Sequence, residues 1–170
     1  QGIQDELKSL GHNFSYDLQN ANGEISTAAS IANKFKSQRV TLAVGIATPT
    51  AQALVNAIKD IPIVFSAVTD PVAAGLVSSL KTSEGNVTGV SDMTPVKEQI
   101  AFLTRIKKIK RLGHVYSGHE TNAVALAELA RKACKALGIE FVETTVTNSA
   151  EVKQAVQTII RRVDGLYVST

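Results

Sequence analysis

The 170-residue sequence predicts an α/β fold made of two Rossmann-like lobes with parallel sheets. Short apolar segments rich in β-branched residues alternate with segments of helical periodicity along most of the chain. This alternation is typical of parallel sheets that helices cover on both faces. A fresh series of strands and helices starts after a basic run at residues 107–111. We therefore predict a first lobe over residues 1–110 and the start of a second lobe over residues 111–170.

The predicted elements follow one another in a regular order. The strands are Asn13–Leu18, Val40–Ala47, Ile63–Val68, Val87–Ser91, Leu112–Ser117, Phe141–Val146 and Leu166–Ser169. The helices are Gln1–Leu10, Glu24–Ser37, Thr50–Lys59, Pro95–Ile109, Glu120–Leu137 and Ala150–Val163. Gly11 and Gly138 follow helical runs where a C-terminal glycine is favoured, and Asn148 or Ser149 is the expected cap of the last helix. A chain that opens on a helix and closes on a strand leads us to expect a segment truncated at both ends.

The charge balance argues against a nucleic-acid partner. Eighteen basic and 15 acidic residues give a formal charge of +3, and most of them are scattered along the chain. One local cluster stands out, and we interpret it as the solvated end of a helix, where cations meet the negative end of the dipole: Arg105, Lys107, Lys108, Lys110 and Arg111. No apolar run approaches the ~20 residues of a membrane span. Cys134, in a helical run, is predicted to be a small buried hydrophobe.

Motifs that carry catalysis are missing from the sequence. It contains no GxSxG, GxxxxGK[ST], HExxH, CxxC or GxGxxG pattern. The three histidines are too scattered for a metal site, and His114 is predicted to be a packing residue within a strand. Ser117 and His119 lack a recognisable third partner for nucleophilic catalysis. We therefore predict no catalytic residue, no metal and no cofactor.

The stretch "TLAVGIATPTAQAL" places the end of a strand directly against the start of a helix. In open parallel sheets, ligands bind outside the carboxyl ends of the strands, where helix N-termini present free N–H groups and a positive dipole end. Thr48 is the expected N-cap, Pro49 the first helical residue and Thr50 part of the first turn. This arrangement suits a carboxylate, although an ordinary capped helix would have the same pattern.

Two further strand ends repeat the layout. Thr69, Asp70 and a helix-starting Pro71 follow the strand that ends at Val68, and Tyr116 precedes the third strand-to-helix junction. Asp70 alone could cap its own helix, and Asn122 alone could be a solvated first-turn residue. Together, the three edges predict a cleft between the lobes. Its candidate ligand-binding residues are Ala47, Thr48, Thr50, Ala67, Val68, Thr69, Asp70, Tyr116, Glu120, Thr121 and Asn122.

The same stretches resemble a known family. "GIATPTAQAL", "IPIVFSAVTDPVAAGLV", "GNVTGVSDMTP", "HETNA" and "VDGLYVST" are similar to ABC-transporter substrate-binding proteins, the family that includes tryptophan- and tyrosine-binding lipoproteins. The resemblance implies a type I periplasmic-binding fold, two lobes hinged around a buried ligand, and no catalysis. It also implies an extracytoplasmic location, a membrane permease as partner, and further segments before and after this stretch, the latter usually with an Asp and an Asn in the site.

These features together define the expected ligand. Hydroxyl and N–H groups at Thr48, Thr50 and Thr69 would bind the carboxylate of an amino acid, and Asp70 or a downstream Asp would bind its ammonium. Tyr116 offers a ring for a flat apolar side chain. Two other functions stay open on the sequence: an effector-sensing domain of a transcription regulator with the same fold, and an enzyme that uses Asp70 and His119.

Overall fold

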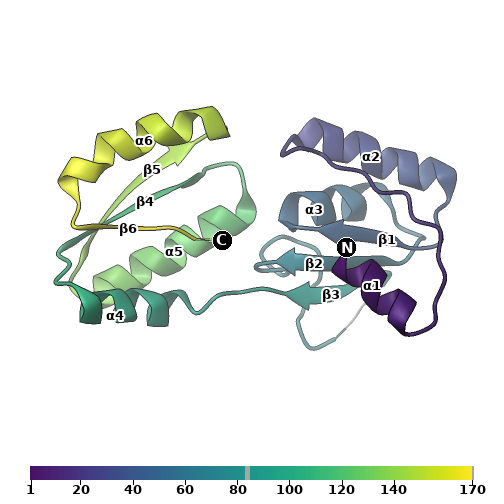
Figure 1. Ribbon diagram of the computed structural model, residues 1–170, viewed down its shortest axis with the longest axis horizontal. Helices are drawn as coiled ribbons and strands as arrows, with labels where there is room; N and C mark the ends of the chain where they lie inside the picture. The colour runs from purple at the N-terminus through teal and green to yellow at the C-terminus, as the bar shows by residue number, and fades with distance from the viewer. Residues whose placement is uncertain (83–84, 170) are drawn as a thin grey trace.

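The chain forms two α/β lobes that lie side by side (Figure 1). The structure is a computed structural model, and it describes residues 1–82 and 85–169. Each lobe contains a three-stranded parallel sheet, as the alternation of strands and helices predicts. Figure 1 shows the chain passing from one lobe to the other between β3 and α4.

The first lobe is built around the sheet order β1-β2-β3. The strands are β1 (Ala43–Ile46), β2 (Ile63–Val68) and β3 (Val87–Ser91). Helices α2 (Ile25–Gln38) and α3 (Thr48–Ala57) pack on each other, and α3 packs on β1 and β2. The core between them contains Leu54, Ile58, Ile63 and Phe65, all almost fully buried. Small residues let α3 approach the sheet closely: a Cβ atom built on Gly45 would lie 2.8 Å from the Ala51 Cα atom.

The second lobe has the sheet order β5-β4-β6. Its strands are β4 (Arg111–Ser117), β5 (Glu140–Val146) and β6 (Gly165–Tyr167). Helices α4 (Val96–Ile106) and α5 (Thr121–Ala136) pack together on one face of the sheet, and α6 (Val152–Ile159) covers the other (Figure 1). Two short 3₁₀ turns, η1 (Ser149–Glu151) and η2 (Ile160–Arg162), flank α6.

Most predicted bounds of strands and helices agree with the structure to within a few residues, and three of the predicted helix-end residues have the expected role. Gly11 and Gly138 follow their helices with φ of +82° and +67°, a region that glycine adopts without strain. Asn148 Oδ1 accepts a hydrogen bond from the Ala150 N–H at 3.1 Å and so caps η1.

The predicted strand Asn13–Leu18 is wrong. The chain there is irregular and exposed after α1 (Gly2–Ser9). A strand needs a hydrogen-bonding neighbour, and no described strand pairs with this segment or with the outer edge of β1. The aromatic residues Phe14 and Tyr16 alone therefore did not produce a strand here, and the segment contains no β-branched residue.

The helix predicted after Pro71 is also absent. Residues 71–75 form a single hydrogen-bonded turn, in which the Gly75 N–H donates to the Val72 carbonyl at 3.0 Å. Gly75 has a φ of +70°, a left-handed conformation that ends helical propagation at once.

Candidate functional site

The carboxyl ends of the two sheets face each other. In Figure 1 the arrowheads of β2 and β3 point toward the second lobe, and that of β5 points toward the first. All described sheet pairings are parallel, so the strand ends of each lobe lie along its facing edge. The three junctions singled out in the sequence therefore lie where the lobes meet.

The first junction starts α3 with a buried hydroxyl. Thr48 is the first residue of the helix and is 2% exposed, and its Oγ1 has no hydrogen-bond partner among the described residues. The prediction of Thr48 as N-cap is wrong, because the cap position belongs to Ala47, whose φ of +74° turns the chain into the helix one residue earlier. Pro49 is accordingly the second helical residue.

Thr50 has a different role from the one predicted for its hydroxyl. Its Oγ1 donates to the backbone carbonyls of Ile46 and of Ala47, the latter at 2.9 Å. The hydroxyl proton is therefore used in hydrogen bonds to the last residues of the strand and the turn after it, and Thr50 stabilises this junction.

The second junction, at the end of β2, is held by hydrogen bonds from backbone N–H groups to the side chain of Asp70. Ala67 has a φ of +53°, next to a break in the strand register, and Val68 and Thr69 are buried. Asp70 Oδ1 accepts hydrogen bonds from the Val72 and Ala73 N–H groups at 3.1 and 3.0 Å. Asp70 thus caps the turn that follows it, which was the alternative left open by the sequence.

The two alanines with positive φ are neighbours. The Ala47 N–H donates to the Ser66 carbonyl at 2.9 Å, which places the end of β1 against Ala67. Both alanines are exposed at the facing edge. Non-glycine residues with positive φ are uncommon and tend to cluster at functional sites, so this pair marks the edge as unusual.

The third junction leads from β4 into α5. Glu120 occupies the N-cap position, and Thr121 and Asn122 form the first turn. The Asn122 Oδ1 atom is buried and unpartnered within the described part of the chain. Two of the predicted residues, Thr48 and Asn122, therefore contribute buried polar atoms without partners, one from each lobe.

A hydrogen bond joins these two helix starts. Gln52 Nε2 donates to the Ala74 carbonyl at 3.0 Å in its own lobe and approaches Thr121 Oγ1 at 3.5 Å in the other. Gln52 lies one turn after Thr48, so both side chains share one face of α3. The face of α3 that carries Thr48 therefore meets the first turn of α5. Sequence analysis missed Gln52, although its four-residue spacing from Thr48 was a signal that could have found it.

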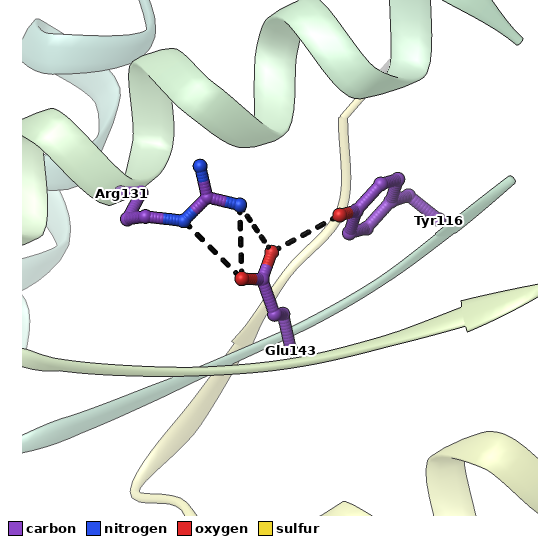
Figure 2. A network of polar contacts seen from close by, with 3 residues as sticks. All are labelled: Tyr116, Arg131 and Glu143. Atoms are coloured by element: carbon purple, nitrogen blue, oxygen red, sulfur yellow. Dashed lines mark hydrogen bonds and ion pairs between the residues drawn. The ribbon is translucent and has the colours of Figure 1, made fainter. Parts of the chain in front are cut away.

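Tyr116 is part of a polar network on the sheet face covered by α5. Figure 2 shows its hydroxyl directed at Glu143 of β5, to which it donates a hydrogen bond at 3.1 Å. Arg131 of α5 holds the same carboxylate through two nitrogens, with Nη2 2.8 Å from Glu143 Oε2. Burial, with the Glu143 hydrogen bond second, raises the pKa of Tyr116. The hydroxyl of Tyr116 is therefore held by its own lobe. Glu143 and Arg131 carried no sequence signal, since they lie 12 residues apart on different elements.

His114 packs inside the second lobe, as predicted, but only one of its ring nitrogens has a partner, since the buried Nε2 has none among the described residues. It is fully buried, its Nδ1 lies 2.9 Å from the Tyr167 carbonyl, and its ring stacks on that of Tyr116 with centroids 5.1 Å apart. Desolvation lowers its pKa, against smaller opposing effects from the Tyr167 carbonyl and from Glu143. The buried thiol of Cys134 is also part of the core, and its burial raises the pKa to about 11.

No group of three or more His, Cys, Asp or Glu side chains within residues 1–82 and 85–169 is arranged to hold a metal ion. Over the same residues, no helix has the length and apolar character that crossing a membrane requires.

Two α/β lobes with facing strand ends are the architecture of a two-lobe binding protein. The model of the ABC transporter substrate binding protein family matches residues 1–170, and the chain belongs to this family. It is 39% identical over 171 residues to the tyrosine-binding protein of Clostridioides difficile strain R20291. That match covers all of this chain and 50% of the relative, so the chain spans about half the length of the curated relative it matches.

Two solved structures serve to compare the arrangement of the two lobes in this chain with that in its relatives. A domain from Streptococcus pneumoniae in complex with L-Trp is 34% identical with a TM-score of 0.92, over 97% of this chain and 57% of that one. The ligand-free, open structure of a substrate-binding protein with adhesive properties from Clostridium difficile is 38% identical but gives a TM-score of 0.65, over 98% and 58%. These matches confirm the predicted type I periplasmic-binding fold. Because coverage and identity are so similar, the difference in TM-score indicates that the lobes of this chain are placed as in the L-Trp complex.

Proposed function

We propose that this chain is part of the solute-binding component of an ABC importer and that it holds a free L-amino acid between its lobes. The observation that carries the proposal is that two buried polar atoms at opposed helix starts, Thr48 Oγ1 and Asn122 Oδ1, have no hydrogen-bond partner among the described residues. A buried polar atom without a partner costs about 1–3 kcal/mol. A ligand with its own donors and acceptors would remove this cost at both positions.

The ligand class follows from the chemistry of the junctions. The N-termini of α3 and α5 present unpaired N–H groups and positive dipole ends, which favour a carboxylate. Thr48 would donate to that carboxylate, and Thr69 lies buried at the adjoining strand end. Asp70, whose Oδ1 is already fixed by its turn, would offer Oδ2 to the ammonium group.

An aromatic side chain is proposed on separate grounds. Ala47 and Ala67 present only methyl groups at the facing edge, which leaves room for a large flat group. The names of relatives support this choice, since one is a tyrosine-binding protein and another was solved with L-Trp. Tyr116 is retained as a candidate wall through its ring, since its hydroxyl is held by Glu143.

The remaining parts of the proposal concern the biological setting. Binding is followed by transfer to a membrane permease, which recognises the closed lobes, and no reaction takes place on the ligand. The location is extracytoplasmic, as membership of the family supports.

The test is a thermal-shift screen of the full-length protein against amino acids, sugars and divalent cations, followed by calorimetry. Stabilisation by L-amino acids, greatest for aromatic ones, is expected because a ligand that binds the folded state alone raises its stability. Stabilisation by a sugar or a metal alone, with no response to any amino acid, would overturn the proposal. Equal stabilisation by aliphatic and aromatic amino acids would leave the class in place but reject the aromatic preference.

A further inference from the structure

The end of the second lobe farthest from the first is formed by three chain segments with a common charge. They are residues 105–111, 135–140 and 160–164, which we call the basic end. Figure 1 shows the C-terminal ends of α4, α5 and α6 gathered there, at the amino ends of β4 and β5. Its basic residues, all exposed, are Arg105, Lys107, Lys108, Lys110, Arg111, Lys135, Arg161 and Arg162.

Specific contacts hold the three segments together. Asp164 Oδ2 accepts hydrogen bonds at 2.8 Å from the N–H groups of Lys110 and of Arg111, and Lys107 Nζ donates to the Asp164 carbonyl at 3.0 Å. The Glu140 N–H donates to the Lys110 carbonyl at 2.9 Å. The fold therefore joins positive charges that lie up to 57 residues apart in the sequence.

The charge of the basic end differs in sign from that of the rest of the chain. It holds eight of the 18 basic residues and two of the 15 acidic residues, Glu140 and Asp164. Its formal charge is therefore +6, while the remaining residues sum to −3. The overall formal charge of +3 is therefore the sum of a strongly positive basic end and a negative remainder of the chain.

Compensation of helix dipoles accounts for only part of this cluster. Arg105 and Lys135 lie in the last turns of α4 and α5, where cations are favourable. Lys108, Lys110 and Arg111 lie beyond the end of α4, outside the reach of that effect.

Large apolar side chains are exposed among the charges. Ile106 is 68% exposed, Ile160 is 46% exposed and Leu137 is 45% exposed. Basic residues interspersed with exposed aliphatic ones are typical of surfaces that lie at the headgroup boundary of a bilayer. The three segments contain no aromatic residue on which an unpaired nucleic-acid base could stack, and no Asn or Gln that could pair with adenine.

From these observations we propose that the basic end is a docking surface for a bilayer of anionic phospholipids. Lysine and arginine side chains contact the phosphate groups, and Ile106 and Ile160 enter the boundary between headgroups and acyl chains. The facing strand ends lie at the opposite end of this lobe, so docking leaves the candidate site free (Figure 1).

The experiment is co-sedimentation of the full-length protein with vesicles, which requires no knowledge of the ligand. Vesicles of phosphatidylglycerol in phosphatidylcholine should bind the protein at low salt and release it at high salt, and vesicles of phosphatidylcholine alone should not bind it. The variant Lys108→Gln, Lys110→Gln, Arg161→Gln, Arg162→Gln should bind at least about tenfold more weakly. Ile106→Ser with Ile160→Ser should weaken the binding that remains at intermediate salt.

The matched control removes four exposed lysines elsewhere: Lys8→Gln, Lys36→Gln, Lys81→Gln, Lys153→Gln. It lowers the net charge equally, so near wild-type binding by the control supports a localised surface. Equal loss in both variants, equal binding to both kinds of vesicle, or tighter binding to duplex DNA than to anionic vesicles would overturn the proposal. Circular dichroism confirms that each variant is folded.

Discussion

Gln52 of the first lobe and Thr121 of the second lie within hydrogen-bonding distance, with Nε2 and Oγ1 3.5 Å apart. Because Gln52 Nε2 also donates to the Ala74 carbonyl, its side chain is anchored before it reaches across. The contact joins the helix starts that carry the buried atoms of Thr48 and Asn122. The side chain of Gln52 therefore links the two helix starts that make up the candidate site.

Gln52→Ala is expected to weaken ligand binding without unfolding either lobe. The bond is long and partly buried, so a loss of between about 0.5 and 1 kcal/mol in binding free energy is expected. Calorimetry on Gln52→Ala, Thr121→Val and the double variant measures it, and the two single effects should not add. Gln157→Ala, at an exposed position of α6, is the control. Fully additive effects would show that the two residues are not coupled.

Thr48→Val should change stability and affinity in opposite directions. Valine has nearly the same shape and removes a buried hydroxyl without a partner, so the ligand-free protein should gain up to about 1 kcal/mol of unfolding free energy. Ligand binding should lose about 1.5–3 kcal/mol, the value of a hydrogen bond to a charged group. Urea unfolding and calorimetry provide the two measurements. An unchanged affinity in a folded variant would remove Thr48 from the site.

His114 should make the protein less stable as the pH falls below neutrality. Its folded-state pKa lies below the ordinary value of 6.5, so the unfolded state binds more protons, and stability is lost as the pH drops from 6.5 toward the folded-state pKa. The carboxyl groups with lowered pKa, Asp17, Glu151 and Asp164, lose their contribution only near and below 4.5. Urea unfolding between pH 6.5 and 5 should show a slope that His114→Gln reduces. His12→Gln, at an exposed position, is the control.

Glu143→Gln should lower the pKa of Tyr116 because it removes the negative charge beside the hydroxyl, while the effect of burial remains. The chain has three tyrosines and no tryptophan, so tyrosinate absorbance resolves the change, and Tyr116→Phe assigns it. Stability should fall by less than about 1 kcal/mol, since the pair with Arg131 is partly exposed. An unaltered titration would show that the hydroxyl is not held by Glu143 in solution.

Gly89→Ala should destabilise the first lobe by about 1–3 kcal/mol through overpacking. A Cβ atom there would collide with the carbonyl oxygen and ring of Phe65 on the neighbouring strand. Urea unfolding measures the loss. Gly2→Ala, where a Cβ atom meets open space, should have no such effect.

Much of the fold was predictable because local pattern and tertiary environment agree. Ile63–Val68 and Val87–Ser91 are strands with the predicted bounds, since each is a short β-branched run next to a paired neighbour. Asn13–Leu18 contains Phe and Tyr but no β-branched residue, and it has no described partner strand; pairing is not a local property. The position of α4 against α5 could not be derived either, because it depends on how the chain crosses between lobes.

For the candidate site, sequence indicated the junctions but not the orientation of their side chains. Thr48 and Asn122 each have a buried side-chain oxygen without a described partner at the facing edges. The side chains of Thr50 and Asp70 instead form hydrogen bonds with nearby backbone groups. A single φ value decides some of these outcomes, as that of Ala47 does for Thr48, and such values have no sequence signature in alanine. Whether the predicted residues contact a ligand stays a prediction.

The burial of Cys134 makes the chain a convenient object for single-molecule work. With a pKa of about 11, only about one thiol in ten thousand is ionised at neutral pH, and the side chain is inaccessible in the folded state. Maleimide dyes would therefore not react with Cys134 in the folded protein, but they would react with cysteines introduced at exposed positions. One dye on each lobe would then follow opening and closing by energy transfer in an otherwise unaltered protein.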